Sequence, residues 1–194
     1  FVGRVAPEKG VADAIDLARR TGLPLRFAAK VYDRLEQEHF AEVVQPAIDE
    51  GIVTFLGELG PPERDALYAG AVATVMLGAW PEPFGLVAIE SMATGTPVIA
   101  RRAGGLTETI EHNVTGFLVD DLVEAELAVQ HVAELSRSAV RQHVIEHFLP
   151  SRMVDAYEAV YRELIRPQAE QVAEGRPALV PMQMPTRTAS GATP

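Results

Sequence analysis

The sequence of 194 residues predicts an α/β fold built around a parallel sheet. Short apolar runs alternate with amphipathic stretches as far as about residue 120, and glycine or proline separates most of them. Some runs, such as Val72–Leu77, lack the polar–apolar alternation of a half-exposed strand, which is typical of strands covered by helices on both faces. Such β-α alternation favours right-handed crossovers. We therefore predict a Rossmann-like, doubly wound parallel sheet of about six strands, followed by C-terminal helices.

Each element is predicted from these runs and from the residues that separate them. Strands are expected at Phe1–Val5, Leu23–Ala29, Ile52–Leu56, Val72–Leu77, Pro97–Ala100 and Gly116–Val119. Helices are expected at Val11–Arg20, Asp33–Glu50, a segment that opens at Pro61, Leu86–Ala93, Leu106–Glu111, Leu122–Leu135, Ala139–Phe148 and Ser151–Ile165. Glycine follows the first two helices, and two consecutive prolines open the third, as helix boundaries require.

Composition excludes several classes of protein. A formal net charge of −10 argues against a nucleic-acid partner, which would need a basic face. The absence of cysteine excludes disulfides, thiolate catalysis and cysteine-based zinc sites, and it fits a reducing compartment. No apolar run approaches the roughly 20 residues of a transmembrane segment, so none is expected.

The chain is expected to contain one domain, residues 1–166, and a disordered proline-rich tail, residues 167–194. Phe1 already lies inside a predicted strand, so we expect the natural chain to start upstream. Five apolar residues of the last helix are predicted along one side, and they pack either on this domain's own sheet or against another domain. They are Met153, Tyr157, Val160, Tyr161 and Leu164.

The stretch Trp80–Ala100 holds two carboxylates at notable positions, Glu82 in a loop and Glu90 within the helix Leu86–Ala93. Apolar residues surround Glu90, which predicts a helix buried on both flanks. A buried carboxylate is costly unless something hydrogen-bonds it. The partner is either a nearby arginine, helped by the helix dipole, or a ligand polyol such as a ribose. The residues alone leave both explanations open.

Four ordered motifs carry a resemblance to a known family. Glu82 and Glu90 enclose seven residues in the run E-P-F-G-L-V-A-I-E. This run resembles the Glu-x7-Glu signature of family 4 retaining glycosyltransferases, which have the GT-B fold and use nucleotide-sugar donors. Phe1–Gly10 resembles the first strand and loop of the family's C-terminal domain, and Gly104–Glu108 and Thr115–Val119 resemble its later loops. The resemblance ends near residue 165 and covers only the donor-binding half.

The resemblance implies roles for individual residues. Arg4 and Lys9 would stabilise the leaving diphosphate, and Glu82 would orient the donor sugar, so these three form the expected catalytic set. The expected donor-binding set is Gly3, Arg4, Lys9, Glu82, Phe84, Gly85, Leu86, Glu90, Gly104 and Gly105. Two general rules agree, because parallel sheets bind ligands at the carboxyl ends of their strands and helix N-termini bind anions. For Gly104 and Gly105, an ordinary strand-to-helix turn remains an equal alternative.

The resemblance also implies an activity: transfer of a sugar from a nucleoside-diphosphate sugar to an acceptor with retention of configuration. It implies no metal or cofactor besides the donor substrate, and an N-terminal acceptor domain that is absent from this chain. We expect a cytoplasmic protein, with any membrane contact made through the missing half. The alternatives are a non-catalytic nucleotide-sugar-binding or partner-docking module and, with less support, a GT-B epimerase or phosphorylase. The sequence identifies neither base, sugar nor acceptor.

One competing motif is set aside. His143–His147 has the H-x-x-E-H spacing of a zinc protease. Val140, Val144 and Phe148 mark the core face of the same helix, however, so we expect that helix to be structural.

Overall fold

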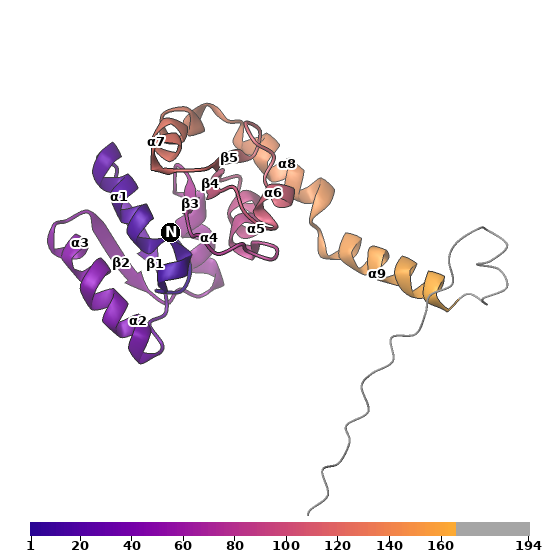
Figure 1. The fold of residues 1–194 in the computed structure, drawn as a ribbon. Coiled ribbons are helices and arrows are strands. Elements are labelled where there is room, and N and C mark those ends of the chain that lie inside the picture. Colours follow the sequence, from indigo (N-terminus) through magenta and orange to yellow (C-terminus); the bar gives the residue numbers. More distant parts are fainter. Residues whose placement is uncertain (166–194) are drawn as a thin grey trace, which may run out of the picture. The chain divides into compact units, whose positions relative to one another are not determined.

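The computed structural model describes residues 1–165 (Figure 1). It divides into the unit Phe1–Leu149 and a second unit that begins at Pro150, and each is described by itself. The tail predicted at residues 167–194 lies outside the described residues. In the first unit strands and helices alternate along the chain, and all strand pairs are parallel, which confirms the α/β class.

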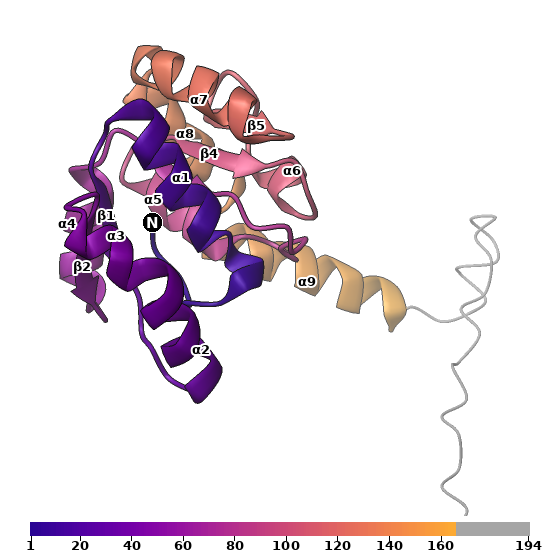
Figure 2. The same cartoon turned by 60° about the vertical axis from the view of Figure 1, so that its left-hand side comes forward.

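The strands form two parallel sheets, β1-β2 and β3-β4-β5. Their bounds are β1 Leu25–Ala28, β2 Val53–Gly57, β3 Thr74–Met76, β4 Val98–Arg101 and β5 Gly116–Val119. An isolated parallel bridge joins Val2 to Ala28 of β1. We call β1 and β2 with Val2 the first half-sheet, and β3 to β5 the second half-sheet; they occupy different sides of the unit (Figures 1 and 2).

The strand predicted at Phe1–Val5 is reduced to this bridge. The Ala28 N–H donates to the Phe1 carbonyl at 3.0 Å, and the Gly3 N–H donates to the Ala28 carbonyl at 3.2 Å. The chain then turns into the short 3-10 helix η1, Pro7–Lys9. A strand extends only as far as its bonded neighbours. The described residues therefore contain five strands rather than the predicted six.

Helices cover both faces of the sheets. Their bounds are α1 Val11–Thr21, α2 Arg34–His39, α3 Gln45–Asp49, α4 Pro61–Ala69, α5 Leu86–Ala93, α6 Leu106–Thr109, α7 Leu122–His131, η3 Val132–Glu134 and α8 Arg137–His147. The helices α1, α3 and α7 pack on one face, and α4, α5 and α8 on the other. Helix α1 joins the half-sheets. Its Ile15 packs in the apolar cluster that contains Phe27 of β1, whereas Leu17 packs in the cluster that contains Ile99 of β4.

The helix predicted at Asp33–Glu50 is present, but it changes its hydrogen-bond pattern midway. Asp33 caps α2 by accepting the Glu36 N–H at 2.9 Å. Between α2 and α3 lies the π-helical turn η2, Phe40–Val44. Pro46 follows this turn and has no N–H for an ordinary helical bond, which accounts for the local irregularity.

The prediction that α5 is buried on both flanks is wrong. Ala88 and Met92 are fully buried beneath β4 and α8, but Leu86 is 66% exposed. Apolar composition alone does not show which side of a helix meets the core, and here only one side does. The side of Val87 and Glu90 is half-buried, which leaves it available to a site.

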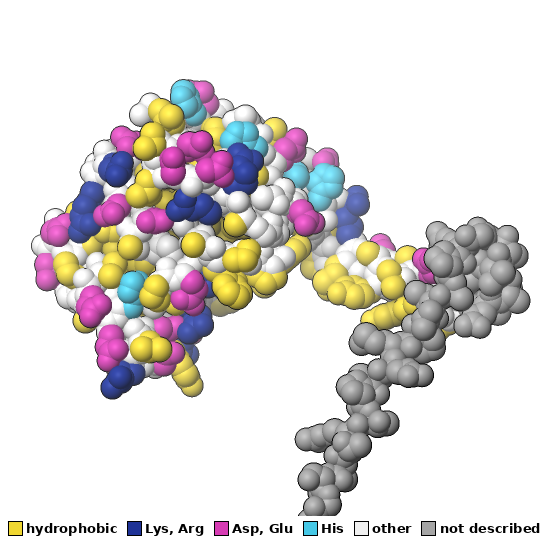
Figure 3. Space-filling model, viewed as in Figure 1, with side chains coloured by type: hydrophobic (Ala, Val, Ile, Leu, Met, Phe, Trp, Pro, Cys, Tyr) yellow, Lys and Arg dark blue, Asp and Glu magenta, His cyan; other side chains and the backbone are white. Residues whose placement is uncertain are grey.

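The second unit contains α9, Pro150–Leu164. Its predicted apolar stripe is exposed, and the rings of Tyr157 and Tyr161, one turn apart, lie 6.2 Å from each other. Figure 3 shows hydrophobic side chains gathered along this segment. Among residues 1–165, no helix combines the length and apolar character that a membrane crossing requires.

Candidate functional site

A small cavity of about 60 Å³ lies at the carboxyl ends of the strands. The residue after Val2, the residues after β3 and the first turns of α5 and α6 all contribute to its wall. The lining residues are Phe1, Val2, Gly3, Glu8, Lys9, Met76, Gly78, Trp80, Glu82, Val87 and Leu106. The cavity therefore lies where parallel α/β sheets bind ligands.

Two glycines bring the loop of η1 against the end of β3. Gly10 has φ of 75°, in the left-handed region, and a Cβ there would overlap the backbone of Leu77 and Gly78. A Cβ at Gly78 would in turn overlap the backbone of Glu8 and Lys9. Only glycine permits this mutual approach. The contact fixes Lys9 beside the second half-sheet.

Lys9 and Glu82 form an ion pair at the cavity wall. Their side chains are 27% and 22% exposed, so solvent and ligands reach both. Lys9 therefore pairs with a distant residue of the expected catalytic set rather than with its neighbour Glu8.

The loop of Glu82 is held by the glycines that precede α6. The Gly105 N–H donates to the Glu82 carbonyl at 2.7 Å. A Cβ at Gly104 would overlap that carbonyl, and a Cβ at Gly105 would overlap the backbone of Pro83. These glycines thus allow their own backbone to touch that of the Glu82 loop. The Gly105 amide is bonded to this loop, which leaves the Gly104 amide for a ligand.

The N-terminus of α5 opens beside the same loop. Gly85, with φ of 85°, caps the helix without a side-chain hydrogen bond, so its first-turn amides have no side-chain acceptor. Phe84 is 46% exposed, and its ring lies 6.0 Å from that of Phe148. Leu86 projects outward, and Val87 reaches the cavity.

Glu90 has protein partners. Arg64 Nη2 lies 3.1 Å from one carboxylate oxygen, and the Tyr68 hydroxyl donates to the other at 3.2 Å. Burial, and after it the charge of Glu90, raises the pKa of Tyr68 well above its usual value. The arginine partner anticipated for Glu90 is therefore present. Since Glu90 follows Val87 by three residues, it lies on the same side of α5, one turn beyond the cavity.

Arg4 points to a different group from Lys9. Its Nε donates to Glu36 at 2.6 Å, and its Nη2 lies 3.8 Å from Asp33. Glu36 is 3% exposed and also accepts the Tyr32 N–H at 2.7 Å. That amide, and then Arg4, holds the pKa of Glu36 below its usual range, and the hydrogen bond to Glu36 raises the pKa of Arg4. Arg4 does not line the cavity.

The structure thus brings part of the expected set together. Gly3, Lys9 and Glu82 share the cavity; Phe84, Gly85, Leu86, Gly104 and Gly105 frame the loop of Glu82; Glu90 lies a turn away; and Arg4 is held on Glu36. Sequence reasoning missed Arg64, Tyr68 and Glu36. Of these three, only Arg64 could have been noticed in the sequence, because it is a positive charge in the first turn of a helix, where acidic residues are favoured.

The rejected histidine motif lies on α8. His143 approaches the Thr109 carbonyl at 3.3 Å and the Glu111 carboxylate at 3.6 Å. Val140 and Val144 are buried, which confirms the predicted core face. Within residues 1–165, no three metal-ligating side chains lie close enough together to hold an ion.

The comparisons with known proteins agree with one another on the family of this chain. Residues 1–147 match the family described as glycosyl transferases group 1. The D-inositol 3-phosphate glycosyltransferase of Nocardiopsis dassonvillei is 35% identical over 91% of this chain and 45% of its own length. Sucrose-phosphate synthase of Thermosynechococcus elongatus aligns with a TM-score of 0.72 at 29% identity, over 84% of this chain and 45% of that one.

A third similar protein was solved with a ligand. The Anabaena protein HepE, in complex with UDP, aligns with a TM-score of 0.68 at 25% identity, over 82% of this chain and 49% of that one. The chain therefore spans about half the length of these relatives, the first of which is named a glycosyltransferase. By the match over residues 1–147, the chain belongs to the group 1 glycosyl transferases.

Proposed function

We propose that this chain is the donor-binding half of a retaining, metal-independent, family 4 glycosyltransferase. It would bind a nucleoside-diphosphate sugar and pass the sugar to an acceptor with its anomeric configuration kept. The observation that carries the proposal is the Lys9–Glu82 ion pair, which lines a cavity at the carboxyl ends of the strands. UDP in the similar HepE structure supports a nucleotide-sugar donor.

The ion pair suits both parts of the donor. Lys9 carries a compact positive charge that a diphosphate can share or take over from Glu82. Negative charge builds on the diphosphate as it leaves, so Lys9 stabilises the transition state more than the ground state. Once displaced from Lys9, the Glu82 carboxylate can accept hydrogen bonds from sugar hydroxyls. Donor binding would therefore replace the Lys9–Glu82 ion pair by two contacts, one between Lys9 and the diphosphate and one between Glu82 and the sugar hydroxyls.

Glu90 and Arg4 have supporting roles in this proposal. Arg64 and Tyr68 hold the Glu90 carboxylate in place, and at 34% exposure its oxygens keep further lone pairs that can accept a hydrogen bond from a ribose hydroxyl. Arg4 is 61% exposed although Glu36 anchors its Nε, so its outer nitrogens can turn to a phosphate. The amides at the start of α5 and at Gly104 complete the expected donor contacts.

The proposed site is half of a larger one. A cavity of about 60 Å³ is far smaller than the roughly 300–1,000 Å³ typical of ligand pockets. We propose that residues 1–166 form the nucleotide-sugar-binding domain and that an N-terminal domain supplies the acceptor site and the closure that excludes water. Alone, the chain is expected to bind nucleotide weakly and to transfer little. A cytoplasmic location remains part of this proposal.

A thermal-shift titration tests the donor site. UDP, GDP and ADP, and their glucose and mannose conjugates, are titrated against the chain and against Lys9→Met, Glu90→Ala and Arg4→Ala. A ligand at a hundred times its dissociation constant adds about 2.7 kcal/mol to the unfolding free energy. Losing one charge-assisted bond weakens affinity about 10- to 100-fold. Arg34→Met removes an equal charge from a side chain that is 85% exposed on α2, and it should leave affinity unchanged.

A shift with one base, reduced in the site variants but not in Arg34→Met, supports the proposal and names the nucleotide. Equal binding by all variants would reject this site. Nucleotide binding without sugar transfer, even after an acceptor domain is joined to the chain, would favour the alternative of a non-catalytic nucleotide-sugar-binding module.

A further inference from the structure

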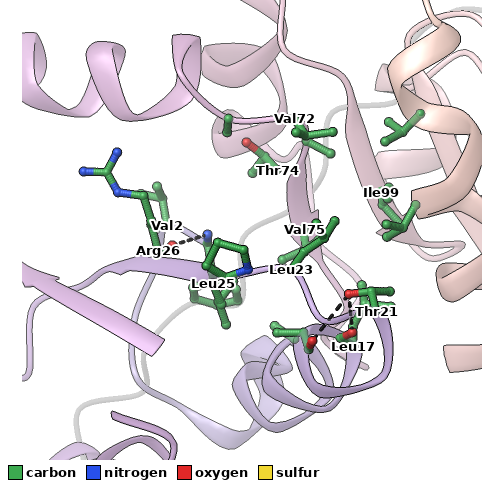
Figure 4. Close-up of a pocket in the computed structure, with 18 of the residues that line it drawn as sticks. Val2, Leu17, Thr21, Leu23, Leu25, Arg26, Val72, Thr74, Val75 and Ile99 are labelled. Atoms are coloured by element: carbon green, nitrogen blue, oxygen red, sulfur yellow. Dashed lines mark hydrogen bonds between the residues drawn. The ribbon is translucent and has the colours of Figure 1, made fainter. Parts of the chain in front are cut away.

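The buried charge of the first unit lies at the carboxyl ends of the strands. At their amino ends, a second cavity of about 240 Å³ has a mostly apolar wall, with Leu25 of β1 on one side and Val75 of β3 on the other (Figure 4). At the carboxyl ends, helix α2 follows β1 and carries Glu36, which is the only buried charged side chain within residues 1–165. A buried carboxylate is costly unless it is bonded, so the partners of Glu36 indicate its task.

The two oxygens of Glu36 bind different parts of the chain. One accepts the Tyr32 N–H at 2.7 Å, and the other accepts Arg4 Nε at 2.6 Å. Asp33, the N-cap of α2, and Glu36 have the spacing of a capping box, in which the carboxylate reaches back to the N–H of the N-cap residue. Here it reaches Tyr32 instead, and its second oxygen holds a side chain from the loop after Gly3. A helix cap alone does not require that second bond.

The bond at Nε fixes the guanidinium of Arg4 without using its outer end. A guanidinium has five N–H donors in a planar fork, and Glu36 occupies one of them. Arg4 Nη2 lies 3.8 Å from Asp33, beyond hydrogen-bond distance, and among the described residues Arg4 makes no further hydrogen bond. The side chain is 61% exposed. Its outer nitrogens are therefore open to an anionic ligand, while Glu36 sets their direction from behind.

We propose that Glu36 is a positioning residue for the donor diphosphate, which holds Arg4 by Nε so that Nη1 and Nη2 meet phosphate oxygens as a preformed pair. This role rests on the proposed donor site, whose cavity is lined by Gly3, the residue before Arg4. A side chain that is held before the ligand arrives loses less conformational freedom on binding. A lysine at this position could not be held in the same way, because it has no second nitrogen.

The opposite effect on binding is expected if Glu36 only neutralises Arg4. A carboxylate beside a cation weakens the attraction that a phosphate feels, so removal of the carboxylate would then strengthen nucleotide binding. A positioning role predicts weaker binding, because the guanidinium loses its fixed orientation. The direction of the change in affinity therefore separates the two explanations, whatever the change does to stability.

Titration calorimetry with UDP, GDP and ADP tests the role of Glu36. The samples are the unchanged chain, Arg4→Met, Glu36→Met, the double variant and Asp33→Asn. Methionine keeps the approximate length of each side chain and removes its hydrogen bonds. Asp33→Asn is the matched control, because it removes an equal charge 3.8 Å from the same guanidinium, and asparagine still caps the helix.

Glu36→Met is expected to weaken binding of the preferred diphosphate about 3- to 10-fold. Once Arg4 is already methionine, the same change should alter affinity by no more than about twofold. Asp33→Asn should bind as tightly as the unchanged chain or more tightly. Unchanged or tighter binding by Glu36→Met, with weaker binding by Arg4→Met, would overturn the role of Glu36 and leave the donor site standing. No loss with either Arg4→Met or Lys9→Met would reject the donor site, and the role of Glu36 with it.

If Glu36→Met does not fold, the unchanged chain still decides. The NMR signal of the Arg4 Nε–H reports the bond to Glu36 directly. When the diphosphate binds, this signal should stay protected from solvent exchange, while the signals of the outer Nη groups shift. Faster exchange at Nε on binding would mean that the diphosphate draws Arg4 away from Glu36, and this would overturn the proposal.

Discussion

The boundary between the two half-sheets, which we call the seam, is tightly packed at the carboxyl ends of the strands and open at their amino ends. At the carboxyl end Gly10 and Gly78 bring two backbones into contact, and a cavity of only about 60 Å³ remains beside the Lys9–Glu82 pair. At the amino end β1 and β3 stand apart across a cavity of about 240 Å³ with an apolar wall. The end of β3 is therefore held tightly by the η1 loop where ligands are expected, whereas the opposite end of β3 stands apart from β1.

This difference separates two tasks of one fold. At the carboxyl end, side chains of opposite charge must be placed accurately, and glycine contacts do this by fixing the backbone rather than by filling space. At the amino end, mostly apolar side chains of both half-sheets, α1 and α4 line the cavity instead. At the tight end the backbone contact and the ion pair can be perturbed separately, and the following changes do so in order of decreasing effect.

Gly10→Ala should break the tight end. The left-handed φ costs a side chain about 1–2 kcal/mol, and overlap with the backbone of Gly78 adds about 1–3 kcal/mol, so we expect a loss of about 3 kcal/mol. Gly51→Ala is the matched control, because Gly51 has the same φ of 75° with nothing within 4 Å of its Cβ position. Urea unfolding measures both. Equal losses would show that conformation alone, and not the backbone contact, accounts for the effect.

The ion pair at the tight end should contribute least to stability. Lys9 and Glu82 are partly exposed, and pairs of this kind contribute about 1 kcal/mol or less. A double-mutant cycle of Lys9→Met and Glu82→Gln, followed by thermal unfolding, measures their coupling. A coupling above about 3 kcal/mol would mean that the pair holds the seam together, and that the glycine contact is not the main restraint there.

The fold was predictable wherever local residues decide it. The bounds of α5 matched the expected Leu86–Ala93, because Gly85 before it and Gly95-Thr96-Pro97 after it are strong local boundaries. Phe1–Val5 has equally strand-like residues, but a strand also needs a partner along its length. Pairing of this kind is not visible in local sequence, so the sixth strand was overpredicted.

Some contacts within the proposed site could be predicted from the sequence and others could not. Resemblance placed Lys9 and Glu82 in one set, and the structure brings them together across 73 residues. The partner of Arg4, Glu36, lies 32 residues away in another helix, and no local pattern points to it. For Glu90 the need for a partner followed from simple electrostatics, although the identity of Arg64 and Tyr68 did not.

The contact between Gly10 and Gly78 also limits how the pocket can be redesigned. Neither glycine tolerates a side chain while the other backbone stays in place, so these two positions offer no route to a new specificity. Val87 and Leu106 line the same cavity and carry side chains that can be shortened. If the cavity binds the donor as proposed, a library meant to change which donor is accepted would therefore begin with these two residues and leave the glycines fixed.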